Sequence, residues 1–158
     1  MSQDTARAHL RAAGLEDRIR VSEADTATVA TAAAAFGVAP AQIAKTLSFL
    51  VNGKAVLVLA DGVARVDNRK FKDAFGVKAK MISPGEVEAL VGHAPGGVCP
   101  FGSREGVDVW LDDSLRKFDR VDPAAGDAHT AVELTVAELE RAARPLGWVD
   151  VTKESDPA

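Results

Sequence analysis

The sequence has 158 residues, a length that fits one domain, and its single cysteine excludes an intramolecular disulfide. A formal net charge of −4 argues against a protein that coats nucleic acid along its length. No apolar run approaches the roughly 20 residues of a membrane span and no signal-peptide pattern opens the chain, so we expect one cytoplasmic domain over residues 1–158.

The first half of the chain predicts two helices followed by a β-hairpin. The helices follow from apolar spacing and alanine content, and each ends at a glycine that suits a C-cap. The hairpin follows from Asn52-Gly53, which separates two apolar runs and is the strongest short-range hairpin signal. The expected elements are helices over 5–13 and 26–36, the second capped by Asp25, and strands over 43–51 and 54–60.

Short helices and short strands are predicted in the second half. Ser83-Pro84-Gly85-Glu86, for example, has a capping serine, proline at the first helical position and glutamate at the third. The full set predicts a single α+β domain with a curved, mixed, mainly antiparallel sheet flanked by short helices. The expected elements are helices over 66–75, 84–91 and 136–144, strands over 78–82, 107–111, 118–121, 130–134 and 148–151, and a loose tail over 153–158.

Residues 92–102 contain four glycines and two prolines, which excludes a helix interior or a central strand. Gly96-Gly97 permits positive φ and lets a ligand approach the main chain, while Pro95 and Pro100 stiffen the two sides of the loop. Two interpretations are equally compatible with this composition. The loop either presents several N–H groups to a ligand or simply connects a helix to a strand.

Three further features could carry chemistry. Lys45 interrupts an apolar strand, so its side chain either reaches solvent or points into a polar pocket. Cys99 and His93 could act as nucleophile and base, although we favour a buried, unreactive thiol. Residues 65–80 hold six basic and two acidic residues, which fits either contact with RNA phosphates or a solvated helix face. The histidines lack the spacing of metal ligands, so we expect no metal or other cofactor.

Several stretches, taken in order, resemble the YbaK family of aminoacyl-tRNA deacylases, which is related to the editing insertion of bacterial prolyl-tRNA synthetase. The resemblance covers about residues 19–151. The lysine before Thr-Leu and the Gly-Gly-x-x-Pro loop are jointly specific to the family. The stretches are Ile43-Ala44-Lys45-Thr46-Leu47, the loop 92–102, Trp110-Leu111-Asp112-Asp113-Ser114-Leu115, Gly126, and Val132-Glu133-Leu134-Thr135 with Glu138-Leu139.

This resemblance implies the YbaK fold and a trans-editing hydrolase that cleaves the ester of a mischarged aminoacyl-tRNA without metal. The implied partners are the acceptor end of the tRNA and prolyl-tRNA synthetase. Lys45 matches the family's functional lysine, and Gly96 to Pro100 match the loop whose amides face the substrate carbonyl. Cys99 stands where serine is often found, which leaves the substrate preference open. Candidate catalytic residues are Lys45, Gly96 and Gly97, and candidate substrate-binding residues are Thr46, Arg65, His93, Val98, Cys99, Pro100 and Asp112.

A second class of function fits the same residues. A catalytically silent module could use this pocket to hold a tRNA end or a nucleotide. The presence of Lys45 together with the glycine loop favours the enzyme. The sequence leaves open the amino acid removed, the tRNA preferred and the oligomeric state.

Overall fold

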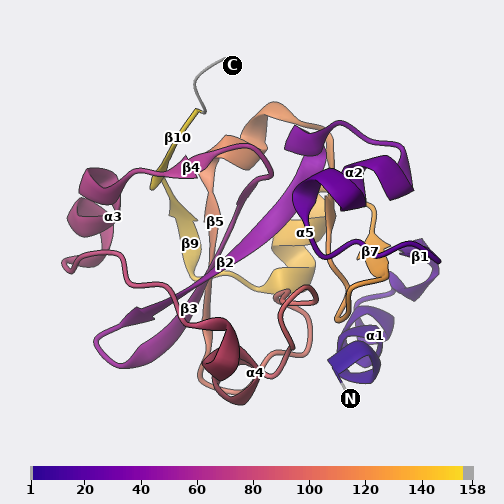
Figure 1. Ribbon diagram of the computed structural model, residues 1–158, viewed down its shortest axis with the longest axis horizontal. Coiled ribbons are helices and arrows are strands. Elements are labelled where there is room, and N and C mark those ends of the chain that lie inside the picture. The colour runs from indigo at the N-terminus through magenta and orange to yellow at the C-terminus, as the bar shows by residue number, and fades with distance from the viewer. Residues whose placement is uncertain (1, 155–158) are drawn as a thin grey trace.

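A six-stranded sheet lies at the centre of the computed structural model, which describes residues 2–154 (Figure 1). In spatial order its strands are β8 (Leu134–Thr135), β6 (Arg120–Pro123), β2 (Ile43–Val51), β3 (Lys54–Asp61), β5 (Asp108–Asp112) and β9 (Gly147–Val149). The central pair β2–β3 and the edge pair β6–β8 are antiparallel, while β2–β6, β3–β5 and β5–β9 are parallel. Two antiparallel ribbons complete the strands: β1 (Ile19–Val21) with β7 (Thr130–Val132), and β4 (Arg65–Val66) with β10 (Thr152–Lys153).

Helices cover both faces of this sheet, so the predicted α+β class with a mixed sheet is confirmed. Glycine in the left-handed conformation ends α2, α3 and α4, as the sequence predicts for Gly37 after α2 and Gly76 after α3. The helices are α1 (Ser2–Ala12), α2 (Val29–Phe36), α3 (Asn68–Phe75), α4 (Pro84–Val91) and α5 (Val136–Ala143), with 3-10 turns at Glu16–Arg18, Pro40–Gln42 and Asp113–Lys117.

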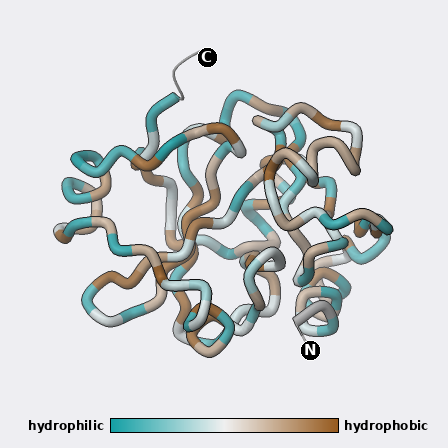
Figure 2. The backbone as a smooth tube through the Cα atoms, viewed as in Figure 1, coloured by the Kyte–Doolittle hydropathy of each residue, from teal (hydrophilic) through white to brown (hydrophobic). Residues whose placement is uncertain are grey.

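The β2–β3 hairpin turns at Asn52-Gly53, as predicted, with φ of 52° and 81° at the two residues. Alternate side chains of β3 enter two different cores: Leu57 and Leu59 enter the larger one, and Val56 and Val58 the smaller. A strand buried on both faces needs a continuous apolar sequence, which is why residues 55–60 show no polar alternation. Figure 2 shows hydrophobic segments along this centre of the fold.

The larger core fixes the glycine-rich loop. Leu10 of α1, Val91 of α4 and Leu139 of α5 pack in it, together with Cys99 and Phe101 of the loop itself. The smaller core joins α3 to the opposite face of the sheet, and α2 packs on the start of β2. The loop 92–102 is therefore anchored by its second half, while residues 94–98 run over the surface of this core.

Several element boundaries differ from the prediction, three of them for identifiable reasons. The helix predicted from residue 26 begins at Val29, because Thr28 rather than Asp25 accepts the N-cap hydrogen bond. The strand predicted over 78–82 is reduced to one bridge between Met81 and Phe49. The strand predicted over 130–134 divides into β7 and β8, because its first part pairs with β1 and its second with β6.

The C-terminal segment also departs from the prediction. The strand expected over 148–151 ends at Val149, and the chain then forms β10 beside β4. Lys153 therefore belongs to a paired strand rather than to a loose tail. Residues 155–158 lie outside the described residues.

Candidate active site

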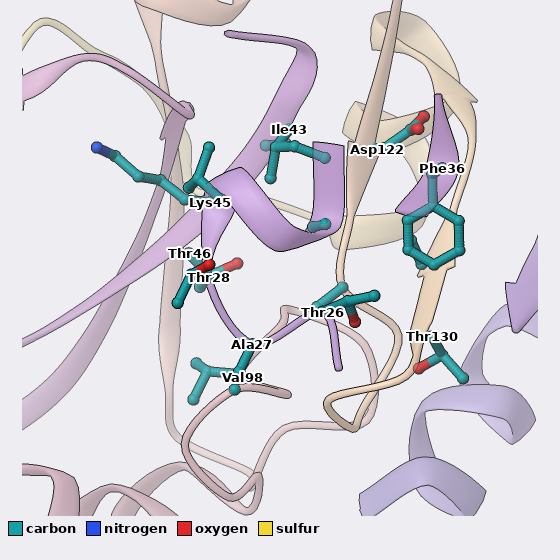
Figure 3. Close-up of a pocket in the computed structure, with 16 residues that line it drawn as sticks. Thr26, Ala27, Thr28, Phe36, Ile43, Lys45, Thr46, Val98, Asp122 and Thr130 are labelled. Carbon is teal, nitrogen blue, oxygen red and sulfur yellow. The ribbon is translucent and has the colours of Figure 1, made fainter. Parts of the chain in front are cut away.

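A cavity of about 180 Å³ lies between the start of β2, the N-terminus of α2 and three loops (Figure 3). The loops are 22–28, 94–98 and 124–130. Four threonines supply hydroxyl groups to the wall, Lys45 and Asp122 are its charged residues, and glycine and apolar side chains supply the rest. The lining residues are Thr26, Ala27, Thr28, Val29, Ala32, Phe36, Ile43, Ala44, Lys45, Thr46, Gly96, Val98, Asp122, Ala124, Thr130 and Ala131.

Two adjacent glycines hold the loop 94–98 against its neighbours. Gly96 has φ of +89°, and a Cβ at this position would lie 3.1 Å from the Cβ of Ala27. Gly97 does not have positive φ; its requirement is space, because a Cβ there would lie 2.5 Å from the backbone of Gly126. At Gly97 the group in close contact is thus the backbone of Gly126. This contact fixes the position of the neighbouring Gly96 at the cavity wall.

The amide groups of this loop are not equivalent. Gly97 donates its N–H to the carbonyl of Ala94 at 3.0 Å, so this amide is already occupied. The neighbouring amides of Gly96 and Val98 have no protein acceptor within residues 2–154, and both residues line the cavity. The free N–H donors of this loop are therefore those of Gly96 and Val98, the residues before and after Gly97.

Lys45 lies at the rim of the cavity, opposite Ala60 in the β2–β3 register. Its Nζ donates a hydrogen bond to the carbonyl of Ala64, and in Figure 3 it points away from the other labelled side chains. Burial lowers the pKa of Lys45, and the charge of Asp61 opposes this shift. Asp61 itself forms an ion pair with Lys117. Lys45 is consequently a cation held at the edge of the cavity, directed outward.

Thr46, the next residue, belongs to the opposite face of β2 because side chains alternate along a strand. Its hydroxyl oxygen is buried without a hydrogen-bond partner in the described chain, although Thr46 lines the cavity. A buried hydroxyl without a partner is costly, so Thr46 is an unsatisfied polar group in the cavity wall.

Asp122 is the acidic residue in the cavity wall, with 2% of its surface exposed. Its Oδ2 accepts a hydrogen bond from Arg20 at 2.5 Å, and the Arg20 guanidinium also lies 5.1 Å from the centre of the Phe36 ring. Burial raises the pKa of Asp122 from 3.8 to about 6, although Arg20 acts in the opposite direction. Desolvation therefore outweighs the ion pair at this site.

Replacing Asp122 with asparagine should flatten the dependence of stability on pH between about 4 and 6. The folded protein holds this proton up to a pKa of about 6, whereas the unfolded chain releases it near 4, so the unfolding free energy falls as pH rises through this window. Melting temperatures of both proteins from pH 4 to 7 provide the measurement, with Glu105→Gln as control, because Glu105 is an exposed carboxylate that is not among the groups that shift the pKa of Asp122. Equal slopes for the parent and Asp122→Asn would contradict the assignment.

His93 and Cys99 are buried beneath the loop and do not line the cavity. Nε2 of His93 lies 2.7 Å from the carbonyl oxygen of Phe101, which can only accept, so Nε2 carries the proton. This same nitrogen is the one 3.6 Å from the Cys99 sulfur, and a protonated nitrogen cannot act as the base for a thiol. Burial also raises the pKa of Cys99 to about 12. The pair lacks the properties of a nucleophile and its base.

The remaining predicted site residues lie elsewhere. The buried carboxylate of Asp112 accepts hydrogen bonds from the amides of Ser114 and Val151 and from the hydroxyl of Thr152, which joins the end of β5 to the C-terminal segment. Pro100 lines a separate hollow, and Arg65 is exposed on β4. Of the predicted residues, the cavity brings together Lys45, Thr46, Gly96 and Val98.

Sequence reasoning missed the wall formed by Thr26, Thr28, Asp122 and Thr130. One signal was available: Asp122 stands between Val121 and Pro123 in a strand, the same kind of interruption that singled out Lys45. The threonines gave no local signal in the sequence. Thr26 and Thr130 come to the same cavity because their loops are joined by a hydrogen bond from the amide of Thr26 to the carbonyl of Ala128 at 2.6 Å.

Within residues 2–154, no three His, Cys, Asp or Glu side chains are grouped so that they could hold a metal ion. Nor does this part of the chain contain a helix with the length and apolarity needed to cross a bilayer.

Comparison with known proteins gives a consistent result. The family model of the aminoacyl-tRNA editing domain matches residues 23–142. The uncharacterized protein YwhH of Bacillus subtilis is 42% identical over 155 residues, covering 98% of this chain and 99% of YwhH. The proline–tRNA ligase of Streptococcus suis is 27% identical over 146 residues, which cover 90% of this chain and 23% of the ligase.

Solved structures agree with this match. A crystal structure described as a candidate trans-editing enzyme for prolyl-tRNA synthetase has a TM-score of 0.86 and 29% identity, covering 96% of this chain and 97% of that one. A second crystal structure, of a hypothetical protein, has a TM-score of 0.84 and 29% identity over 94% of this chain and 99% of that one.

Proposed function

The chain belongs to the aminoacyl-tRNA editing domain family, and on this premise we propose that it is a trans-editing hydrolase acting in the cytoplasm. Its substrate is the ester of a mischarged aminoacyl-tRNA, in particular one misacylated by prolyl-tRNA synthetase. Relatedness to a segment of proline–tRNA ligases supports this choice of tRNA. The structural likeness to a candidate trans-editing enzyme supports action as a separate protein.

The observation that carries the proposal is the pair of free amides at Gly96 and Val98. An aminoacyl ester is already activated, so its hydrolysis needs positioning and stabilisation of the oxyanion more than a strong nucleophile. The two N–H groups stabilise the negative charge that develops on the carbonyl oxygen. They are fixed in advance because Gly97 packs against Gly126 and donates to Ala94.

The size of the cavity indicates which part of the substrate enters it. Its volume of about 180 Å³ is below the roughly 300–1,000 Å³ of sites that enclose drug-sized ligands. The cavity therefore receives a small aminoacyl group, and the terminal adenosine stays outside. Lys45, at the rim and directed outward, is placed to bind the ribose or phosphate oxygens of that adenosine.

The reaction proceeds by attack of water on the ester carbonyl carbon. The carbon–oxygen ester bond breaks, the ribose oxygen leaves and takes up a proton, and the products are a free amino acid and an uncharged tRNA. The neighbouring hydroxyl of the terminal ribose helps to activate the water. No protein nucleophile is required, in keeping with the burial of Cys99.

A panel of charged tRNAs tests this function. The purified protein should release the amino acid from tRNAPro carrying a small noncognate residue such as alanine, serine or cysteine, and should spare prolyl-tRNAPro. Release is followed with radiolabelled amino acid, and the same residues on their cognate tRNAs are the control for tRNA preference. Binding of these tRNAs without any release would instead identify a module that holds the tRNA end.

A further inference from the structure

A cationic surface lies apart from the cavity, on α3 and the segment that follows it. A hollow of about 500 Å³ there is lined by Asn68, Arg69, Lys72, Lys78 and Ala79. Three of these residues are exposed cations without an ion pair in the described chain, and no carboxylate lines the hollow. Figure 2 shows the outer turns of α3 as hydrophilic. Such a surface is unusual in a chain of net charge −4 and favours a polyanionic partner.

The carboxylates of α3 do not neutralise this surface. Asp67 is the N-cap of the helix, and its carboxylate accepts hydrogen bonds from the amides of Arg69 and Lys70. Asp73 lies one turn beyond Arg69, but it forms no ion pair with that residue. Lys70 is the α3 cation that is paired, with Asp150 at 3.0 Å. The cations of the hollow therefore remain free for a ligand.

A second observation is independent of the hollow. In the ribbon formed by β4 and β10, Arg65 stands directly opposite Lys153. Like charges in this position destabilise an antiparallel pair, and both residues are exposed without an ion pair in residues 2–154. The charge of Asp67 attracts Lys153, but no carboxylate forms an ion pair with either cation in the described chain. An external anion that binds both side chains would remove the repulsion.

The chain connects the two cation groups to the rim of the cavity. Lys45 at the cavity rim donates to the carbonyl of Ala64, and Arg65 is the next residue. β4 leads directly into α3, and Figure 1 shows β4, β10 and α3 on the same side of the molecule. A hollow beside Ala64 borders this surface. Lys153 lines it, its other cations Lys70 and Lys117 are ion-paired, and three carboxylates also line it, those of Asp113, Asp150 and Glu154.

We propose that Arg65, Lys153, Arg69, Lys72 and Lys78 form a phosphate track that binds the backbone of the tRNA acceptor end while the aminoacyl group occupies the cavity. This inference rests on the proposed function and adds to it a role for the C-terminal strand. Release of counterions from RNA phosphates by these cations supplies affinity without sequence recognition. The geometry of the cavity does not depend on the track.

Charge reversal at Lys153 gives the sharpest test. Lys153→Glu removes the repulsion with Arg65 but adds one with Asp67, so the melting temperature should stay close to that of the parent, while affinity for an uncharged tRNAPro transcript should fall about tenfold at low salt. Arg69→Gln/Lys72→Gln removes two phosphate contacts and should reduce the slope of log K against log salt by about two. The single-turnover rate at saturating enzyme should stay at the parent value, because the cavity is unchanged.

Arg141→Gln is the matched control. Arg141 is an exposed cation on α5 that lines a different hollow, so this variant should bind the transcript with the parent's affinity and salt slope. The track is refuted if Lys153→Glu and the double variant bind as the parent does, or if Arg141→Gln loses as much affinity as they do. If the parent releases amino acid and the track variants bind the transcript with the parent's affinity and salt slope, only the track fails. A parent that neither binds nor hydrolyses charged tRNA overturns both proposals.

Discussion

Replacing Lys45 with alanine is expected to lower the rate of deacylation at least tenfold, which corresponds to about 1.4 kcal/mol of transition-state stabilisation. The cation at the cavity rim is proposed to hold the terminal adenosine, and its loss leaves the ester free to move relative to the amides of Gly96 and Val98. The melting temperature should change little, because Lys45 is half-buried and, within residues 2–154, its ammonium group bonds one carbonyl, that of Ala64. Single-turnover hydrolysis and thermal unfolding provide the two measurements.

Lys54→Ala is the control for this experiment. Lys54 lies in the same hairpin, at the far end of β3, and pairs with Asp108 at 3.0 Å. Its replacement should leave hydrolysis at the parent rate. Normal turnover in Lys45→Ala would remove Lys45 from the mechanism, and a large loss of stability would make it a structural residue instead.

Replacing Gly97 with alanine is expected to reduce both activity and stability. The added Cβ would lie 2.5 Å from the backbone of Gly126 and 2.6 Å from the Cα of Asp127, a separation that real Cβ atoms do not adopt. The loop 94–98 must therefore move, at a cost of about 2 kcal/mol for overpacking. This corresponds to a fall of roughly 4–8 °C in melting temperature. Displacement of the Gly96 and Val98 amides should lower deacylation on the order of tenfold or more.

Two companion variants separate the loop mechanism from a thiol mechanism. Gly85→Ala adds a Cβ with nothing within 4 Å in α4 and should keep full activity without loss of stability. Cys99→Ser keeps the backbone of the loop and should continue to hydrolyse the ester. If Gly97→Ala is fully active while Cys99→Ser is inactive, the amides are not the stabilising groups and the cysteine must be reconsidered as nucleophile.

Local signals in the sequence were sufficient for the scaffold. Asn52-Gly53 fixed the central hairpin because only residues that tolerate positive φ fit its turn, and Gly76 and Gly92 ended their helices for the same reason. Thr135 and Glu138 form the capping box that begins α5. These features depend on residues close in sequence, so their chemistry can be read without the rest of the fold.

The composition of the cavity wall depends on contacts that local signals do not contain. Thr26 reaches the cavity because its loop bonds the 126–130 loop, and the register of β1 with β7 sets that contact. The glycine loop was recognised, but which amides are free was not predictable, since this follows from the bond between Gly97 and Ala94. The hydrogen bonds of Asp112 were not predictable for a related reason. Its partners Val151 and Thr152 lie about 40 residues further along the chain.

The position of β3 implies an order of opening within the native state. This strand is paired on both edges, with β2 and β5, and its side chains are buried on both faces, so its amides should exchange with solvent only when the whole domain unfolds. The loops around the cavity are tied by few backbone bonds, such as those from Ser22 to His129 and from Thr26 to Ala128. These loops can therefore open at a small fraction of the free energy of global unfolding. Entry of the proposed aminoacyl group therefore requires only a local fluctuation, while β3 and its partner β2, which carries Lys45 and Thr46, stay folded.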